Sequence, residues 1–284
     1  MISIRDFYSQ VKRRLEALLP DGGEAEAAAR IIFEDVAGYT KVFIFANGDR
    51  EITASMQERI GAVVDKVAAG MPVQYAVGKA FFMGNNFTVT PAVLIPRPET
   101  AGLVDMVVDD WQGRSDLHVL DIGTGSGCIA ISLARALPFA DVDGMDVSDD
   151  ALAVARRNAV ALKAKVDFEQ SDILRAVPRA EAYDIIVSNP PYVTEQEAKD
   201  MTADVLDHEP HRALFVPDGD PLVFYKAIAS YARKALKRGG KLYLEINQHF
   251  PKKMSELLSG CGFTDVAVLR DYKGNYRYAT AKQP

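Results

Sequence analysis

Residues 119–131, Val-Leu-Asp-Ile-Gly-Thr-Gly-Ser-Gly-Cys-Ile-Ala-Ile, run from one apolar segment through three alternating glycines into another. The first segment has the length and composition of a buried strand, and the second continues as a helix. Gly123, Gly125 and Gly127 let the backbone turn sharply and approach a ligand without a Cβ atom in the way. Open α/β sheets bind their ligands at the carboxyl ends of strands. The stretch therefore predicts an α/β fold with a ligand site after its first strand.

Short apolar runs alternate with helical stretches through the rest of the chain. The expected strands are 117–122, 142–147, 165–168, 183–188 and 241–246, and the expected helices are 126–137, 149–162 and 221–236. Apolar strands spaced by helices pair in parallel and are covered on both faces. Residues 263–269 and 276–281 flank a turn-forming segment, which predicts an antiparallel hairpin at the sheet edge.

The residues before the glycine loop have a different pattern. Apolar residues recur at helical steps over 3–70, and this predicts a small helical bundle. Phe and Val residues surround Gly84-Asn85-Asn86, as expected for a β-hairpin with its turn there. We therefore expect a helical domain over 1–75, a hairpin linker over 76–98 and an α/β domain over 99–284. The helical domain is explained equally well as a structural cap and as a docking module for a large substrate.

Composition restricts the partners and the compartment. The chain has 284 residues, with 48% hydrophobic and 25% charged residues, as in an ordinary globular protein. It contains neither a membrane-spanning apolar run nor a signal peptide. Two distant cysteines fit a reducing cytoplasm and offer no metal spacing. The net charge of −6 argues against an extended nucleic-acid surface, which relies on Lys and Arg to neutralise phosphates.

Acidic residues follow the predicted strands near the glycine loop. Asp121 stands directly before the loop, where a carboxylate suits a cationic ligand such as the ammonium of a methionine moiety. Asp146 ends the second strand and can accept hydrogen bonds from two ribose hydroxyls. Asp172 and Ile173 follow the third strand, where they can meet the amino group and the face of an adenine. These features favour S-adenosylmethionine, although Gly125-x-Gly127-x-x-Ala130 also satisfies the dinucleotide fingerprint of dehydrogenases.

Asn189-Pro190-Pro191-Tyr192 directly follows the apolar run 183–188. A turn would also explain the prolines, but the position at the end of a central strand favours a chemical role. An amide or aromatic amino group is a poor nucleophile, because its lone pair is delocalised. Asn189 and the Pro190 carbonyl can accept its two N–H groups, Pro191 stiffens the loop, and Tyr192 offers a ring face. We therefore predict these four residues as the catalytic set.

The reaction that fits this set is an in-line methyl transfer from a sulfonium to nitrogen. Positioning of the two reactants should dominate the rate. Fixed acceptors should add to it by stabilising the positive charge that develops on nitrogen. The residues call for neither a metal nor a covalent nucleophile.

The tetrapeptide and the glycine loop together resemble amino-methyltransferases, which act on adenine N6, guanine N2 or glutamine amides. Further motifs narrow the resemblance, namely Ile95-Pro96-Arg97-Pro98-Glu99-Thr100, Glu209-Pro210 with Ala213-Leu214, and Phe224-Tyr225. Over nearly the whole chain the sequence is similar to the protein-(glutamine-N5) methyltransferases that modify peptide chain release factors.

This resemblance implies a Rossmann-like, seven-stranded methyltransferase domain behind a helical bundle and a hairpin linker. It implies S-adenosylmethionine as methyl donor and the glutamine of the Gly-Gly-Gln loop in class-I release factors as acceptor. The implied cofactor-binding residues are Asp121, Gly123, Thr124, Gly125, Ser126, Gly127, Asp146, Asp172, Ile173 and Asn189. Asn189 would meet both cofactor and substrate, and 190–192 would hold the glutamine. Arg97 and Glu99 either organise the floor between domains or belong to a rigid linker with a salt bridge.

Three departures from the family pattern lie outside the cofactor loop and the tetrapeptide. Ala101 stands where the family usually has a second acid, Asn247 follows Glu245-Ile246 where a glycine is usual, and 219–222 varies a glycine-rich stretch. The competing interpretations are a nucleic-acid amino-methyltransferase and a non-enzymatic S-adenosylmethionine-binding regulator. The acidic balance disfavours the first, and the intact tetrapeptide disfavours the second.

Overall fold

The computed structural model describes residues 2–19, 22–201 and 203–284, and the chain divides into two compact units. The first unit is Met1–Lys79 with Thr202–His208, and the second is Ala80–Met201 with Glu209–Pro284. Each unit has its own hydrophobic core, one cluster in the first and two in the second. None of the helices among the described residues is both long enough and apolar enough to cross a bilayer.

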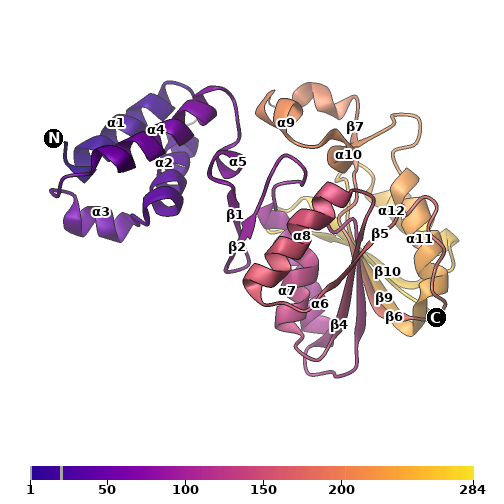
Figure 1. Cartoon of the computed structure of the whole chain (residues 1–284). Coiled ribbons are helices and arrows are strands. Elements are labelled where there is room, and N and C mark those ends of the chain that lie inside the picture. Colours follow the sequence, from indigo (N-terminus) through magenta and orange to yellow (C-terminus); the bar gives the residue numbers. More distant parts are fainter. Residues whose placement is uncertain (1, 20–21, 202) are drawn as a thin grey trace. The chain divides into compact units, whose positions relative to one another are not determined.

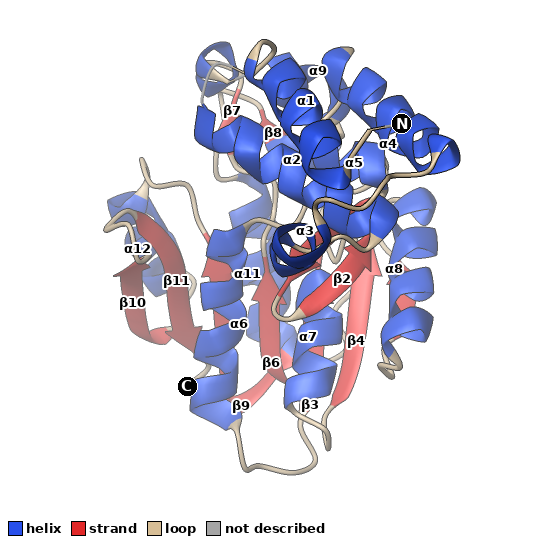
Figure 2. Cartoon of the chain, turned by 90° about the vertical axis from the view of Figure 1, so that its left-hand side faces the viewer, coloured by secondary structure: helices blue, strands red, loops and turns tan. Residues whose placement is uncertain are grey.

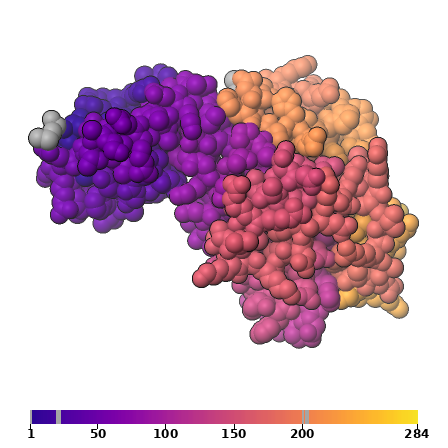
Figure 3. Space-filling view, in the orientation of Figure 1, coloured from indigo at the N-terminus to yellow at the C-terminus, as the bar shows by residue number. Residues whose placement is uncertain are grey.

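The first unit is helical, as the periodicity predicted. Its helices are α1 (Ile4–Glu16), α2 (Gly22–Ala37), α3 (Lys41–Asn47), α4 (Ala54–Ala68), α5 (Val73–Val77) and α9 (Ala203–His208). Ser3, Thr40 and Thr53 cap α1, α3 and α4 by accepting a backbone N–H three residues on. The core holds fully buried residues such as Leu15 and Phe33. The space-filling view shows the residues of α1 to α4 as a packed body at the indigo end of the colour scale (Figure 3).

The predicted hairpin is present, with its turn slightly earlier than expected. Strands β1 (Lys79–Phe82) and β2 (Asn85–Thr88) form a two-stranded sheet. Met83 and Gly84 make the turn at φ values of 45° and 76°, the left-handed backbone that tight hairpins require. Asn85 and Asn86, expected in the turn, belong to β2 instead.

The second unit is built on a seven-stranded sheet in the order β10-β11-β9-β6-β3-β4-β5. Its strands are β3 (His118–Ile122), β4 (Asp141–Asp146), β5 (Asp167–Gln170), β6 (Tyr183–Ser188), β9 (Leu236–Glu245), β10 (Thr264–Arg270) and β11 (Tyr276–Lys282). Five neighbouring strands of the sheet, in the order β9-β6-β3-β4-β5, pair in parallel. Strand β11 is antiparallel to both of its neighbours. The predicted parallel sheet with an antiparallel hairpin at its edge is thus confirmed.

Helices cover both faces of this sheet (Figure 1). On one face lie α6 (Pro98–Trp111), α7 (Cys128–Ala136) and α8 (Asp149–Leu162), and Figure 2 looks onto this face. On the other lie α11 (Val223–Ala235) and α12 (Pro251–Gly260). Successive residues of β3 join opposite cores, with Val119 on the α6–α7 face and Leu120 on the α11 face. Both faces are therefore apolar, as the continuous apolar runs predicted.

A connection between β6 and α11 carries the smaller elements. It contains β7 (Val193–Thr194), the 3-10 turn η1 (Glu197–Asp200), α9, α10 (His211–Leu214) and β8 (Phe215–Val216). β7 and β8 pair in parallel as a separate two-stranded sheet.

Strand β9 starts earlier than the sequence indicated. Gly239 and Gly240 resemble a chain break, yet β9 continues through them with a register shift against β6. Gly240 lies so close to β6 that a Cβ atom would stand 2.9 Å from the Asp184 carbonyl. The two glycines therefore allow an irregularity within strand β9 and do not mark the end of the strand.

Candidate active site

Strand register brings the predicted site residues to one edge of the sheet. Ile122, the last residue of β3, lies opposite Met145 on β4 and Ser188 on β6. The glycine loop therefore starts between the end of β4 and Asn189. The strands that follow β3 in the chain, β4 and β5, lie on one side of this point, whereas β6 lies on the other side. The strand order therefore reverses here, and such a switch point is where open α/β sheets bind ligands.

The glycine loop is tied down on its β4 side. The amides of Gly123 and Thr124 both donate to the Met145 carbonyl, at 2.8 and 3.0 Å, and the Gly125 amide donates to Asp146 Oδ2 at 2.9 Å. Gly123 and Gly125 have positive φ values of 73° and 55°. Among the described residues, a Cβ on Gly123 would meet no atom within 4 Å, and one on Gly125 only a carbonyl at 3.9 Å. The space beside these two glycines is therefore open to a ligand.

Gly127 has a packing role in addition to the one predicted. A Cβ there would stand 2.9 Å from Ile131 Cδ1 and 3.3 Å from Ala155 Cβ. Gly127 therefore permits close packing between α7 and α8, and its contact with the cofactor stays a prediction.

Asp121 is fully buried beneath the loop and holds it to α7. Its Oδ2 accepts from Thr124 Oγ1 at 2.7 Å and from the Ala130 amide at 3.2 Å. Its Oδ1 is buried without a hydrogen-bond partner among the described residues. Burial raises the pKa of Asp121 to about 7. A buried carboxylate oxygen with spare acceptor capacity fits a cationic donor.

Asp146 ends β4, and Asp172 and Ile173 follow β5, so all three lie at the same edge of the sheet as the glycine loop. Both Asp146 oxygens accept backbone N–H groups, from Gly125 and Ser148 at 2.9 Å each, and each oxygen keeps a lone pair for a ribose hydroxyl. Asp172 follows β5 and accepts from the Leu174 amide at 3.0 Å. Ile173 is partly buried against the α11 core, which leaves an apolar surface beside that acid.

Asn158, a residue without a sequence motif, joins three segments at the site. This buried α8 side chain accepts from the Thr88 amide at 2.7 Å and donates to the Thr88 carbonyl at 3.0 Å. It also donates to the Ser126 carbonyl at 2.9 Å. A single carboxamide therefore attaches hairpin strand β2 to the glycine loop.

Asn189 stands at the end of a chain of buried polar groups. Its Nδ2 donates to Thr100 Oγ1 at 3.2 Å, and Thr100 donates to Glu245 Oε2 at 2.8 Å. Thr100 and Glu245 are only 2% and 1% exposed. Burial raises the pKa of Glu245, against the opposing effects of the Thr100 hydrogen bond and the Arg277 charge.

Tyr192 is fixed at both its backbone and its hydroxyl. Its amide donates to the Leu214 carbonyl at 3.2 Å, and its carbonyl accepts from Asn247 Nδ2 at 2.9 Å. Its hydroxyl donates to Glu245 Oε1 at 3.1 Å and accepts from Arg277 Nη1 at 3.3 Å. Burial raises the pKa of Tyr192, so the phenol stays protonated. The tetrapeptide is therefore a rigid loop, as two prolines predicted.

The residues whose roles the sequence left open all make contacts within the second unit. Arg97 pairs with the buried Glu209 at 2.6 Å, and Glu99 pairs with Lys273 at 2.6 Å. Ala101 packs against the α6–α7 core. Asn247, where the family usually has glycine, also donates to the Glu197 carboxylate at 3.0 Å.

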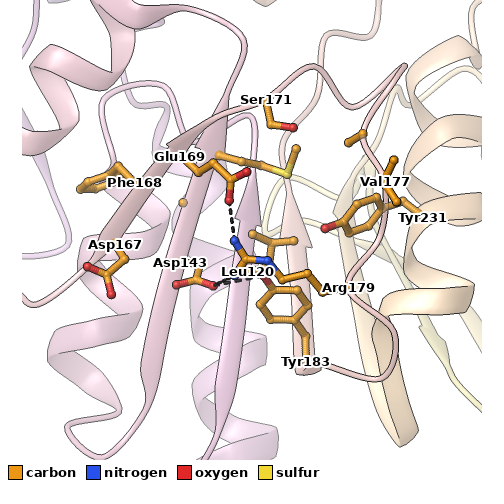
Figure 4. A pocket seen from close by; sticks show the side chains of 13 residues that line it. Leu120, Asp143, Asp167, Phe168, Glu169, Ser171, Val177, Arg179, Tyr183 and Tyr231 are labelled. Atoms are coloured by element: carbon orange, nitrogen blue, oxygen red, sulfur yellow. Dashed lines mark hydrogen bonds and ion pairs between the residues drawn. The ribbon is translucent and has the colours of Figure 1, made fainter.

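The cavities among the described residues of the second unit include the following two. One, of about 310 Å³, is bordered by Tyr192, Glu197, Asn247 and Arg277 and so opens beside the tetrapeptide. The other, of about 210 Å³, lies on the α11 face under the segment that joins β5 to β6 (Figure 4). In the second cavity Arg179 pairs with Glu169 at 2.6 Å and Asp143 at 3.7 Å. None of the residues predicted to hold the cofactor lines this second cavity.

The geometry of the site fits S-adenosylmethionine at its ammonium group and at its ribose. Open space beside two glycines, an unpartnered buried oxygen on Asp121 and spare lone pairs on Asp146 match a ligand with an ammonium group and ribose hydroxyls. A dinucleotide site would use the same loop. The antiparallel β11 replaces the sixth parallel strand of the dinucleotide-binding fold, which favours the methyltransferase alternative.

Comparison with known proteins decides between these alternatives. The methyltransferase small domain family matches residues 103–223, and the PrmC N-terminal domain family matches residues 9–78. The release factor glutamine methyltransferase of Bacteroides thetaiotaomicron is 44% identical over 96% of this chain and 98% of its own length. The chain belongs to the release factor glutamine methyltransferase family.

Two further release factor glutamine methyltransferases also match over nearly their whole length. The Flavobacterium psychrophilum protein is 39% identical over 96% of this chain and 97% of its own. The Koribacter versatilis protein is 34% identical over 100% and 99%. A solved methyltransferase from Pyrococcus furiosus, 18% identical, superposes with a TM-score of 0.52 over 71% of this chain and 89% of its own, which supports the fold. The predicted family and fold class are confirmed.

Sequence reasoning gave no role to Thr100, Glu245, Arg277 or Asn158. One signal was present, because Glu245 is an acid directly after the apolar run 242–244 at the end of a buried strand. An acid in that position demands partners. Asn158 and Arg277 carry no such local signal, since their contacts join segments far apart in the sequence.

Proposed function

We propose that this chain transfers a methyl group from S-adenosylmethionine to the side-chain amide nitrogen of a protein glutamine. The acceptor is the glutamine of the Gly-Gly-Gln motif in class-I peptide chain release factors, and the by-product is S-adenosylhomocysteine. Family membership supports the reaction class. The observation that carries the proposal is the Asn189 carboxamide, whose Nδ2 is committed to Thr100, leaving Oδ1 as the acceptor end.

The residues would divide the work as follows. When bound, S-adenosylmethionine supplies an electrophilic methyl group on a sulfonium. Asn189 Oδ1 and the Pro190 carbonyl accept the two N–H groups of the glutamine amide and direct its lone pair at that methyl. Two such acceptors also stabilise the positive charge that develops on the nitrogen. Tyr192, anchored at its hydroxyl, lines the cavity that would take the glutamine side chain.

The cofactor would lie over the glycine loop. Asp121 would face the methionine ammonium, and Asp146 the ribose hydroxyls. Asp172 and Ile173 would hold the adenine, since an acid can accept from its amino group and an apolar side chain can cover its face. The proposed set needs no metal ion.

The proposed substrate explains the helical unit and the location. A lone glutamine side chain is too small to select one protein among many, so recognition must use surface remote from the reacting atoms. We assign that docking role to residues 1–75, with the hairpin over 76–98 as linker and 99–284 as the catalytic domain. Because release factors act in translation, we also propose that the protein works in the cytoplasm.

A methyl-transfer assay tests the proposal. The protein is incubated with labelled S-adenosylmethionine and a release factor, its Gln→Ala loop variant, DNA or RNA. We expect label only on the intact release factor. Asn189→Ala should lower turnover about 10²- to 10³-fold while cofactor affinity is partly kept, as when one preorganised polar partner is removed. Label on DNA or RNA but not on the release factor would instead establish the nucleic-acid alternative.

A further inference from the structure

We propose that Thr100 and Glu245 are positioning residues for the transfer, and that they fix which end of the Asn189 carboxamide faces the substrate. This rests on the proposed function in one respect, namely that Asn189 Oδ1 accepts an N–H of the substrate amide. The two residues would not touch the reacting atoms. They would act only through the direction of their hydrogen bonds.

Three elements bring the groups together. Ser188 pairs with Leu244 across β6 and β9, so Asn189 and Glu245 follow side by side. Glu245 shares a sheet face with Tyr243, the side that α6 covers. Trp111 of α6 donates to the Tyr243 hydroxyl at 2.7 Å, and Thr100 lies about three turns earlier on the same helix face. The packing of α6 on β9 thus delivers the Thr100 hydroxyl between Glu245 and Asn189.

The direction of the hydrogen bonds follows from the donors available. Arg277 has no acceptor, so it must donate to the Tyr192 oxygen. The single Tyr192 proton then goes to Glu245 Oε1, and the single Thr100 proton goes to Oε2. The Thr100 oxygen can only accept from its remaining neighbour, which must present an N–H. Asn189 therefore turns Nδ2 to Thr100.

Shape alone would not choose this orientation. The oxygen and the amino group of a carboxamide are nearly equal in size, so a flipped Asn189 would fit the same space. A flipped side chain would present N–H groups to the N–H groups of the glutamine amide and remove an acceptor from the reacting nitrogen. The buried Thr100–Glu245 pair makes that state costly, because it would leave two acceptors facing each other.

Substitutions that keep shape but change donors test the proposal. Thr100→Val removes only the hydroxyl, whereas Thr100→Ser retains it. Glu245→Gln replaces an acceptor by an N–H donor, which reverses the Thr100 proton and selects the flipped Asn189. Tyr225→Phe is the control, because it removes another buried hydroxyl beside Glu245, the one that donates to the Glu245 backbone carbonyl at 3.2 Å.

We expect Thr100→Val and Glu245→Gln to lower kcat about tenfold to a hundredfold, a part of the loss from removing the acceptor altogether. The KM for release factor and the affinity for S-adenosylmethionine should stay near wild type. Thr100→Ser and Tyr225→Phe should keep kcat. A normal kcat in both Thr100→Val and Glu245→Gln would overturn the proposal, as would an equal loss in Thr100→Ser or a loss confined to KM.

A second measurement does not depend on the reaction. The Asn189 side-chain amide resonance, assigned by its absence in Asn189→Ala, should exchange slowly with solvent in wild type and in Thr100→Ser. It should exchange faster in Thr100→Val. Unchanged protection in Thr100→Val would overturn the proposal even in an active enzyme. If wild type methylates no release factor, the proposed function fails, while this exchange measurement still decides the orientation.

Discussion

Asp121 shows how one buried side chain can be both a structural anchor and a ligand site. One of its oxygens secures the glycine loop to Thr124 and α7, and the other has no partner among the described residues. The first role could be expected of any acid before such a loop. The second depends on complete burial, which strand position alone does not establish.

The raised pKa of Asp121 predicts a pH dependence of stability. Burial moves this pKa from 3.8 to about 7. Between these values only the folded chain holds the proton, so unfolding releases it and rising pH favours unfolding. The contribution of Asp121 to the free energy of unfolding of the cofactor-free protein should therefore fall across this window by up to about 4 kcal/mol.

Urea unfolding at several pH values measures this effect. Asp121→Asn has no proton to lose there, so its stability lacks this fall with rising pH. The difference between the two proteins should shift in favour of the variant from pH 4 to 7. Parallel pH curves would show that Asp121 titrates normally.

Gly125 gives a prediction on the cofactor loop. Gly125→Val forces a β-branched residue into a backbone with φ of 55° and places methyl groups in the open space beside the loop. We expect calorimetry to detect almost no binding of S-adenosylmethionine, with the fold retained. Gly113→Val is the matched control, because Gly113 also has a positive φ of 80° and free space around it but lies away from the loop. Equal affinity in the two variants would contradict the assignment.

At the scale of the element, apolar periodicity predicted the sheet and its helices. It did not predict the start of every strand or the packing roles of single glycines. Helix α8 begins and ends as predicted, because a Ser148 cap and a clear repeat mark both ends. Strand β9 was expected too short, because two glycines imitate a break. The packing of Gly127 against α8 was not predicted, because sequence spacing cannot separate a glycine that meets a ligand from one that meets a neighbouring helix.

Because Asn158 links the hairpin to the glycine loop, we predict that one substitution there lowers both stability and cofactor affinity. Asn158→Leu removes hydrogen bonds to Thr88 and Ser126 and leaves their buried backbone groups unpaired. We expect about 2–4 kcal/mol less stability in urea unfolding, the scale of unsatisfied buried groups, and weaker cofactor binding in calorimetry. Asn85→Ala, which removes a local hydrogen bond at the hairpin turn, serves as control and should keep cofactor affinity. Normal affinity in Asn158→Leu would show that the loop holds its shape without the hairpin.

At the scale of the whole molecule, the two units differ in what the sequence could tell. The second unit contains sequence motifs that indicate its chemistry. The first unit shows only a helical repeat, which is equally consistent with a structural cap and with a docking module. Its structure adds one observation. Helix α3 has no buried residue, and its Val42 and Phe45 are 77% and 84% exposed. Large apolar side chains so exposed favour a protein partner.

Substitution on α3 tests docking without disturbing a core. Deleting residues 1–75 would strip α9 of the helices it packs with, since Thr202–His208 belongs to the same unit. Val42→Ser with Phe45→Ser should instead raise the KM for intact release factor about tenfold or more, as for lost interface anchors. The rate on a free Gly-Gly-Gln peptide should not change.

Val160→Ser is the control for this test, since Val160 is 80% exposed on α8 of the second unit. It should leave the KM for release factor near wild type. If the double variant also keeps the wild-type KM, α3 is not a docking surface, and the interpretation of the helical unit as a structural cap is favoured.

The Asn158 carboxamide has a thermodynamic consequence beyond its geometry. It ties the hairpin strand and the cofactor loop to one side chain, so a ligand that stabilises the loop must stabilise the hairpin by the same coupling free energy. Linkage is reciprocal, and substitutions that loosen the attachment of β2 to Asn158 at Thr88, which touch no cofactor atom, should therefore alter cofactor affinity. The Thr88 amide proton is a natural reporter of occupancy at the glycine loop, because its exchange with solvent would slow as that loop fills.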